Sequence, residues 1–245
     1  MKLEVRDLTF SYGKRTSEEK PILDKISFEI EKGDILSVIG PNGSGKTTLF
    51  KCLLGQNRVT DGDIFIDGVS INKLSTLQRA EKMAYVPQFF LNAFDYTVMD
   101  TVLMGTAVTM SPLFVPAKSQ MDVAYSAIDV VGISKYADHR MSQLSGGVRQ
   151  LVSIARALAQ RADILIMDEP TSALDYGNQI KIMKTVSDLS EKGYTILISM
   201  HNPKAARKHS DKTLAVFDGR MKAFGLSKDI ITEEFIDELY CTDLI

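Results

Sequence analysis

The chain has 245 residues, of which 44% are hydrophobic and 24% charged, and its formal net charge is −2 at pH 7. This length and composition are typical of one or two soluble globular domains and exclude disordered, collagen-like and coiled-coil chains. Because the charges are balanced, nothing supports binding to nucleic acid through bulk positive charge, and we expect no nucleic-acid partner.

The cysteine content and the lengths of the apolar segments indicate the compartment of the protein and whether it spans a membrane. The two cysteines, Cys52 and Cys241, match neither a disulfide framework nor a zinc spacing, which favours a reducing cytosol. The first residues contain no apolar segment of the signal-peptide kind. No run approaches the roughly 18 apolar residues of a transmembrane helix, so we expect no direct membrane span.

The first part of the chain predicts short strands separated by turns. Strands are expected at Leu3–Phe10, at Ser27–Ile30 and at Ile35–Ile39, the last being a continuous apolar run suited to a buried strand. Three Asp-Gly pairs are typical of two-residue hairpin turns: Asp61-Gly62, Asp67-Gly68 and Asp218-Gly219.

Helical spacing replaces the strand pattern from about residue 90 to 161. Helices are expected at Thr97–Met104, Ser119–Val131 and Ser145–Ala159. Strands return at Ile164–Met167 and Thr195–Ser199, with helical sequence between them. Strands that alternate with helices predict a mostly parallel α/β sheet, so we interpret the chain as one α/β domain with an inserted helical lobe.

A phosphate-binding loop is predicted between the strand Ile35–Ile39 and a helix over Thr48–Leu54. The segment Gly40–Thr47 matches the pattern G-x-x-x-x-G-K-[ST], whose backbone N–H groups curl round a phosphate. Lys46 is expected to reach the β- and γ-phosphates, and the Thr47 hydroxyl to bind Mg²⁺. The residues expected to hold the nucleotide here are Gly40, Asn42, Gly43, Ser44, Gly45, Lys46, Thr47 and Thr48.

Two carboxylates follow the apolar strand Ile164–Met167. Open α/β sheets bind ligands at the carboxyl ends of their strands, which is where Asp168 and Glu169 lie. Asp168 is expected to contact hydrated Mg²⁺. Glu169 is expected to polarise the attacking water as a general base.

The segment Leu144-Ser145-Gly146-Gly147-Val148-Arg149-Gln150 predicts a helix that opens with a hydroxyl and two glycines, an end that favours an anion. Together with the phosphate loop and the acidic strand end, it resembles the signature of ATP-binding cassette (ABC) ATPases. The resemblance covers nearly the whole chain. It implies a P-loop NTPase core with an N-terminal antiparallel β subdomain, and ATP and Mg²⁺ as cofactors. We expect residues 1–88 and 162–245 to form the core and residues 89–161 the lobe, within a single nucleotide-binding domain.

The same resemblance assigns four further residues. It implies that Tyr12 stacks on adenine and that Gln88 senses both Mg²⁺ and the membrane partner. Asp175, at the end of the segment Ser172–Asp175, matches the dimer-contact loop. His201 matches the switch histidine that contacts the γ-phosphate, so the implied catalytic set is Glu169, His201 and Gln88.

The active unit implied by the resemblance is a nucleotide-sandwich dimer, in which Ser145, Gly146 and Gly147 serve ATP bound by the other subunit. Two departures from the family pattern stand out. Val148 replaces the usual glutamine, which can contact the ribose, so nucleotide affinity or selectivity is expected to change. Asn202-Pro203 follows His201 where many relatives have an acid, and we expect the switch to remain.

Three classes of function compete. A GTPase or small-molecule kinase leaves the signature without a role, and Asn72-Lys73 is followed by Leu74-Ser75 rather than by a guanine-reading Asp. A soluble ABC ATPase acting on DNA or ribosomes calls for tandem cassettes or a long coiled coil, which 245 residues with one of each motif do not provide. The ATPase subunit of a membrane transporter is therefore favoured.

The segment Phe89–Val98 carries four aromatic residues in the region where the family receives a short helix of the permease. Core of the helical lobe is the alternative interpretation. The longer stretch from Val86 to Gly105 and the short acidic segment from Thr232 to Tyr240 resemble importers of iron–siderophore, haem, vitamin B12 or molybdate, with an exporter or a lipid-transporting subunit as the alternative. We expect a homodimer, or a pair of ABC subunits, on a permease dimer with a solute-binding protein, peripheral at the cytoplasmic side of the cell membrane.

Overall fold

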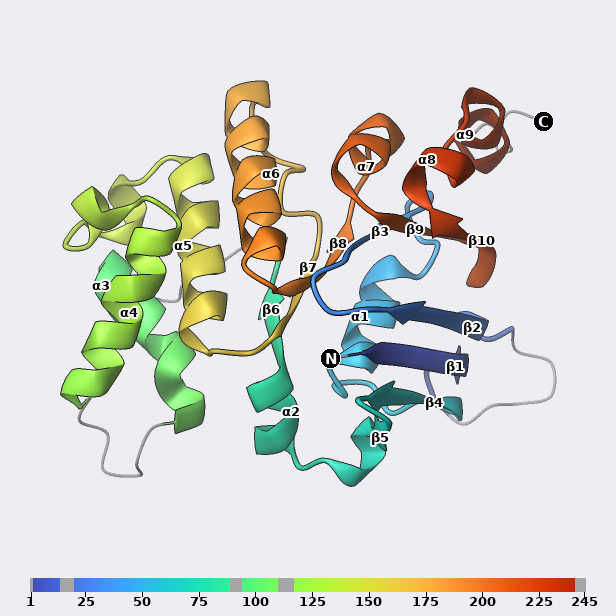
Figure 1. Cartoon of the computed structure of the whole chain (residues 1–245), viewed down its shortest axis with the longest axis horizontal. Coiled ribbons are helices and arrows are strands. Elements are labelled where there is room, and N and C mark those ends of the chain that lie inside the picture. The colour runs from blue at the N-terminus through green and yellow to red at the C-terminus, as the bar shows by residue number, and fades with distance from the viewer. Residues whose placement is uncertain (1, 14–19, 89–93, 110–116, 241–245) are drawn as a thin grey trace.

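The computed structural model describes residues 2–13, 20–88, 94–109 and 117–240. Ten strands in the described residues form one mixed sheet, in the order β5-β4-β1-β2-β10-β9-β3-β8-β7-β6. Figure 1 shows this sheet beside a group of helices, α3, α4 and α5, at the left of the view. The strands are β1 (Leu3–Phe10), β2 (Leu23–Ile30), β3 (Ile35–Ile39), β4 (Asp61–Ile66), β5 (Val69–Ser70), β6 (Met83–Val86), β7 (Ile164–Met167), β8 (Thr195–Ser199), β9 (Lys212–Phe217) and β10 (Arg220–Leu226).

The sheet has a parallel part, as the strand–helix alternation predicts, and an antiparallel part, as the family resemblance implies. Strands β9, β3, β8, β7 and β6 pair in parallel in that order. Strand β1 pairs antiparallel with β2 and with β4. The α/β fold class with an N-terminal antiparallel region is thus confirmed.

Three central strands, β3, β7 and β8, are buried along their whole length. Their continuous Ile, Leu and Val runs suit strands that are covered on both faces. Because the three strands are parallel, their carboxyl ends meet at one edge of the sheet. Gly40 follows β3, Asp168 follows β7 and Met200 follows β8, so this edge positions the candidate site.

Helices cover the sheet and build the lobe. In the lobe, α3, α4 and α5 pack against one another, and their buried residues form one continuous core with residues of β3, β7 and β8. A second core lies between α1 and the antiparallel strands. The helices are α1 (Lys46–Leu53), α2 (Thr76–Lys82), α3 (Val98–Leu103), α4 (Lys118–Val130), α5 (Gly146–Ala159), α6 (Tyr176–Glu191), α7 (Pro203–His209), α8 (Ser227–Ile230) and α9 (Glu233–Tyr240).

Helix starts follow local capping chemistry. The Thr97 side chain accepts a hydrogen bond from the Asp100 N–H, and the Asp100 carboxylate accepts one from the Thr97 N–H, which forms a capping box at the start of α3. The Ser145 side chain caps α5 by accepting from the Val148 N–H. The predicted helices over Thr97–Met104 and Ser145–Ala159 therefore lie within one residue of the observed ones. In the described part of the chain no helix is long and apolar enough to cross a bilayer.

Two of the three predicted hairpin turns are confirmed and one is wrong. Asp67-Gly68 joins β4 to β5 and Asp218-Gly219 joins β9 to β10, with positive φ at both residues of each turn. Asp61 and Gly62 instead begin β4, where Asp61 pairs with Thr9. Only Gly62 has a positive φ, and the register shifts here between Arg6 and Thr9. The pair therefore forms a bulge within a strand rather than a turn between strands.

Candidate functional site

The phosphate loop connects β3 to α1 and contains glycines that the backbone requires. Gly43 has a φ of +79°, and a β-carbon there would meet nothing within 4 Å. Its surroundings are open, so the left-handed backbone rather than crowding selects glycine. At Gly40 a β-carbon would lie 2.0 Å from the Val216 carbonyl oxygen, so close packing selects glycine there.

Lys46 is buried in the loop that it follows. Its Nζ donates to the carbonyl oxygens of Gly40, at 2.8 Å, and of Pro41, at 3.0 Å. Burial lowers the pKa of Lys46, while the charges of Glu169 and Asp168 act to raise it. The Ser44 hydroxyl is also buried and has no hydrogen-bond partner among the described residues. A buried hydroxyl without a partner is unfavourable, which makes Ser44 a candidate ligand-binding residue of this loop.

Asp168 lies at the end of β7, nearly inaccessible to solvent, and three hydroxyl groups surround its carboxylate. Thr47 Oγ1 donates to Oδ2 at 2.8 Å, and the Tyr85 hydroxyl donates to the same oxygen at 3.4 Å. Ser199 Oγ donates to Oδ1 at 2.7 Å. Burial, aided by the Asp168 charge, raises the pKa of Tyr85 to about 12, so its hydroxyl remains a donor at neutral pH.

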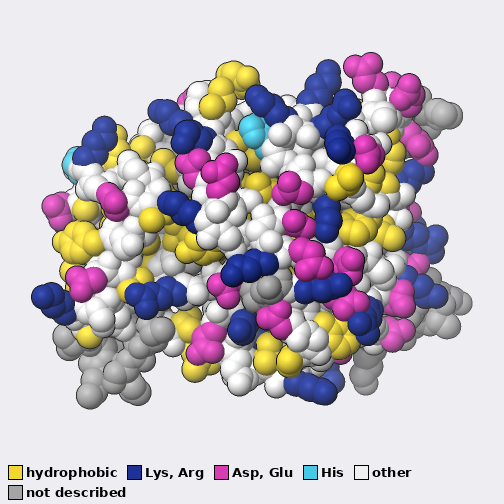
Figure 2. All heavy atoms as spheres, in the orientation of Figure 1, with side chains coloured by type: hydrophobic (Ala, Val, Ile, Leu, Met, Phe, Trp, Pro, Cys, Tyr) yellow, Lys and Arg dark blue, Asp and Glu magenta, His cyan; other side chains and the backbone are white. Residues whose placement is uncertain are grey.

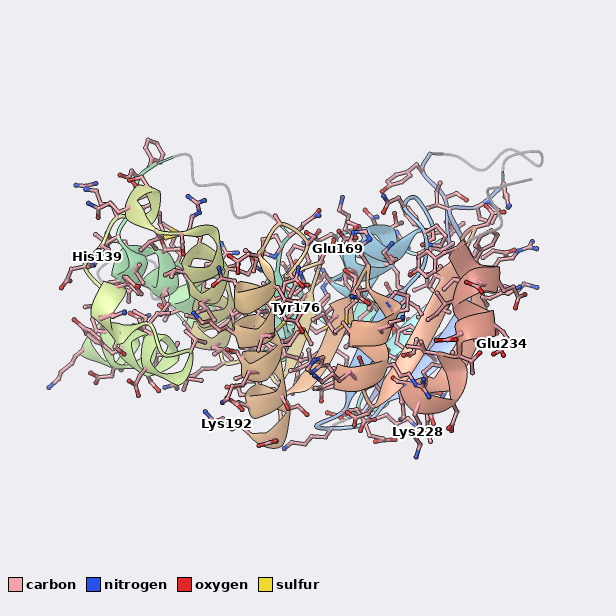
Figure 3. The ribbon with its side chains drawn as sticks, turned by 90° about the horizontal axis from the view of Figure 1, so that it is seen from above. His139, Glu169, Tyr176, Lys192, Lys228 and Glu234 are labelled. Carbon is pink, nitrogen blue, oxygen red and sulfur yellow. The ribbon has the colours of Figure 1, made fainter. Side chains whose placement is uncertain are left out.

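The three residues of the predicted catalytic set meet at one oxygen. Glu169 Oε2 accepts a hydrogen bond from Gln88 Nε2 at 2.8 Å, and His201 Nε2 contacts the same oxygen. The Glu169 backbone is left-handed, with a φ of +45°, which is uncommon for a residue with a side chain. Figure 3 shows Glu169 between His139 of the lobe and Lys228 and Glu234 at the opposite end of the molecule.

The signature segment opens α5 on the lobe. Ser145 and Gly146 are exposed, whereas Gly147 is buried. Gly147 packs closely against α6, because a β-carbon at this position would lie 2.5 Å from the Asn178 side chain. Asp175 caps α6 and accepts from the Asn178 N–H at 2.9 Å, which holds the predicted dimer-contact residue beside the signature. No hydrogen bond or ion pair joins Ser145–Gly147 to the phosphate loop in the described residues.

Tyr12 and the aromatic segment supply exposed rings. Tyr12 is 58% exposed and packs edge-on against Phe10, with ring centroids 4.8 Å apart. The Tyr12 ring is therefore accessible for stacking. Phe94 is 68% exposed, which argues against the lobe-core interpretation for this ring. Phe89 and Phe90 lie outside the described residues. On the face in Figure 2, acidic and basic side chains are interspersed.

Sequence reasoning missed three site residues: Tyr85, Ser199 and Tyr240. The Tyr240 hydroxyl, from α9, accepts a hydrogen bond from the Gly40 N–H at 3.2 Å. Nothing local to Tyr240 signals that contact, because 200 residues separate the partners. A serine at the end of the apolar run Thr195–Ser199 was a detectable signal, since a hydroxyl in a buried strand requires partners.

A phosphate loop between a buried strand and a helix, with two carboxylates at the end of a nearby parallel strand, defines a phosphate-loop nucleotide hydrolase. The family model described as ABC transporter matches residues 23–172. A Helicobacter pylori protein assigned to iron chelatin transport is 35% identical over 100% of this chain and 94% of its own. A molybdate import ATP-binding protein of Haemophilus influenzae is 34% identical over 97% of this chain and 87% of its own.

Solved structures agree. One assigned to the metal-chelate type of ABC transporter, in an inward-facing conformation, has a TM-score of 0.85 at 34% identity over 98% of this chain and 88% of that chain. The dimeric cassette MJ0796, bound to ADP and phosphate, has a TM-score of 0.79 at 28% identity, covering 92% of this chain and 98% of its own. The chain therefore belongs to the ABC transporter family, as a nucleotide-binding ATPase subunit.

Proposed function

We propose that this subunit drives a metal-chelate-type importer and hydrolyses ATP with Glu169 as general base. The observation that carries the proposal is the meeting of Gln88 and His201 at Glu169 Oε2. Gln88 begins the connection from the core to the lobe, and His201 follows β8. A movement of either segment therefore changes the contacts of the carboxylate that activates water.

ATP is proposed to bind in cis to the phosphate loop, with Tyr12 stacked on adenine. Lys46 exchanges its two backbone carbonyl partners for the β- and γ-phosphates, which are stronger acceptors because they are charged. The Ser44 hydroxyl gains the partner that it lacks. The loop N–H groups and the positive end of α1 supply the remaining anion contacts.

Thr47 and Asp168 are proposed to hold Mg²⁺, with Gln88 as a further contact. The fit rests on donor chemistry: a hydroxyl and a carboxylate oxygen lie 2.8 Å apart beside the loop, and Mg²⁺ prefers oxygen ligands. When bound, the ion supplies neutralisation of charge on the phosphates. Asp168 has only 4% of its surface exposed, which keeps its carboxylate in one place.

The active unit is proposed to be a dimer in which Ser145, Gly146 and Gly147 bind the ATP of the other subunit and Asp175 contacts that subunit. The exposed start of α5 supports this arrangement, because it is an anion-binding helix end with no bond to its own phosphate loop in the described residues. In this scheme residues 89–161 act as the lobe that presents the signature.

The partners proposed for this dimer are a permease dimer and a solute-binding protein, at the cytoplasmic side of the cell membrane. The similarity to iron chelatin and molybdate systems supports import of a chelated metal or oxyanion. The exposed ring of Phe94 supports a permease contact near the lobe.

Purification of the native complex under mild conditions tests the proposal. We expect a permease and a solute-binding protein to co-purify, and reconstituted vesicles to take up chelated metal on addition of ATP. The Glu169→Gln subunit should assemble the same complex without uptake, which separates assembly from hydrolysis. Recovery of an exporter permease, or of no membrane protein, would contradict the assignment.

A further inference from the structure

We propose that Ser199 is a positioning residue for hydrolysis, which fixes the Asp168 carboxylate and the Glu169 backbone through one hydroxyl group. The inference rests on the proposed roles of these two acids. The Ser199 Oγ donates to Asp168 Oδ1 at 2.7 Å and accepts from the Glu169 N–H at 2.8 Å. Its single proton and one lone pair are both directed at the acids that follow β7.

Sheet topology explains why this serine reaches both acids. Strand β8 lies between β3, which leads into the phosphate loop, and β7, which leads into the acids. Ser199 is the last residue of β8, and Ile198 pairs with Met167 directly before Asp168. The register of β8 and β7 therefore places residue 199 beside the residues that follow β7.

The two oxygens of Asp168 face different partners. Ser199 holds Oδ1, while Oδ2 faces Thr47 of α1 and Tyr85 of β6. With Oδ1 held, the oxygen toward the proposed metal site keeps its direction. Thr47 also belongs to the proposed metal site, so Ser199 holds the carboxylate from outside that site.

The backbone of Glu169 requires support as well. Its φ of +45° is sparsely populated for residues with a β-carbon, and such conformations persist where surrounding groups determine them. The Glu169 N–H has Ser199 as its acceptor, and this bond helps to set the direction in which the side chain leaves the chain. Gln88 and His201 then meet the carboxylate.

Burial argues that the hydroxyl is there for these bonds. Ser199 has 0% of its surface exposed and directly follows three buried Ile and Leu residues of β8. Branched apolar side chains suit such a strand better than serine does, and a buried hydroxyl is unfavourable without partners.

Ser199→Ala is the test variant and Ser37→Ala its matched control. Ser37 is also 0% exposed, in the neighbouring strand β3, and its Oγ bonds Thr213 Oγ1 at 2.7 Å, away from the acids. For Ser199→Ala in the full chain we expect kcat for ATP hydrolysis to fall about 10- to 100-fold, as for other groups that orient a metal-binding carboxylate. The KM for ATP should stay within about threefold, because the nucleotide contacts remain. Ser37→Ala should keep kcat within about twofold.

Amide hydrogen exchange of Glu169, followed by NMR in the nucleotide-free protein, gives a reading independent of activity. Exchange should accelerate in Ser199→Ala and stay slow in Ser37→Ala and in Ser199→Thr, which retains a hydroxyl. Ser199→Thr should also recover most of kcat. The proposal is overturned if Ser199→Ala keeps wild-type kcat, if both alanine variants lose activity equally, or if Glu169 exchange does not change. Glu169→Gln, measured in parallel, separates failure of the positioning role from failure of the proposed base.

Discussion

Two glycine-rich helix starts can be compared within this chain: the phosphate loop before α1 and the signature segment before α5. Two polar side chains of the phosphate loop have hydrogen-bond partners nearby: Lys46 donates to two loop carbonyl oxygens, and Thr47 donates to Asp168. The second is exposed, and its hydroxyl makes one long bond, from Val148 N to Ser145 Oγ at 3.4 Å. Two glycine-rich segments of similar composition thus differ: two side chains of one are hydrogen-bonded to neighbouring residues, and the other begins a helix whose first residues are exposed to solvent.

Glycine also serves different purposes in the two segments. Gly43 takes a left-handed backbone in open space, whereas Gly147 has a helical backbone and lies against Asn178. A glycine-rich pattern therefore does not by itself tell whether a left-handed backbone or close packing requires each glycine. In the loop the backbone itself forms the cradle, while in the signature a neighbouring helix occupies the space.

The largest expected effect is on ATP hydrolysis and comes from Glu169, which lies near the phosphate loop. Glu169→Gln keeps the shape of the side chain but cannot accept a proton, so ATP hydrolysis should fall roughly 10²–10⁴-fold while ATP still binds. A phosphate-release assay measures this. Glu191→Gln, at the exposed end of α6, is the control. A near wild-type rate would move the base elsewhere, with His201 as the first alternative.

Lys46→Ala removes the ammonium group of the phosphate loop. Loss of the charged donor to the phosphates should weaken ATP binding by about 100-fold or more. Calorimetry measures the change. Lys51→Ala, an exposed lysine of the same helix, should bind ATP as wild type does. Affinity within about twofold of wild type in Lys46→Ala would contradict the phosphate-loop assignment.

Ser145→Arg tests whether the exposed signature segment contacts the other subunit of a dimer. The Glu169→Gln protein should be monomeric without nucleotide and dimeric in saturating ATP without Mg²⁺, because ATP is not consumed. Adding Ser145→Arg should block dimerisation by steric overlap and leave ATP binding to the monomer intact. Light scattering coupled to gel filtration measures mass, with Ser119→Arg on α4 as the control. A Glu169→Gln protein that stays monomeric, or a Ser145→Arg version that still dimerises, removes the site shared between subunits.

Phe94→Glu tests the surface of the lobe. Charged replacement of an interface aromatic should weaken permease binding about 30-fold or more, while basal ATPase activity is retained. Co-purification with the permease measures binding, and circular dichroism checks folding. Tyr125→Glu, an exposed aromatic on α4, is the control. Unfolding of the Phe94→Glu variant would favour the core interpretation.

The smallest expected effect concerns Tyr240 on α9. Tyr240→Phe removes the acceptor of the Gly40 N–H, a bond worth about 1 kcal/mol, so Tm should fall by about 2–4 °C. Tyr176→Phe, 77% exposed, is the control and should leave Tm unchanged. An unchanged Tm in Tyr240→Phe would show that the contact contributes no stability.

Local patterns predicted much of the fold. The runs Ile35–Ile39, Ile164–Met167 and Thr195–Ser199 are strands with the predicted bounds, because continuous apolar runs of this length suit buried strands. The prediction for β2 was too short and began at Ser27 instead of Leu23. The residues before Ser27 are Leu, Asp, Lys and Ile, which do not alternate and so give a weaker strand signal than a continuous apolar run.

The sequence by itself determined the phosphate loop, the acidic strand end and the signature, because each is formed by residues adjacent in the chain. Only the tertiary structure decided that Ser199 joins Asp168 to Glu169 and that Tyr240 reaches Gly40. These contacts depend on the order of strands in the sheet, with β8 between β3 and β7, and on where α9 packs. Strand order follows from the burial of whole faces at once, so no single segment encodes it.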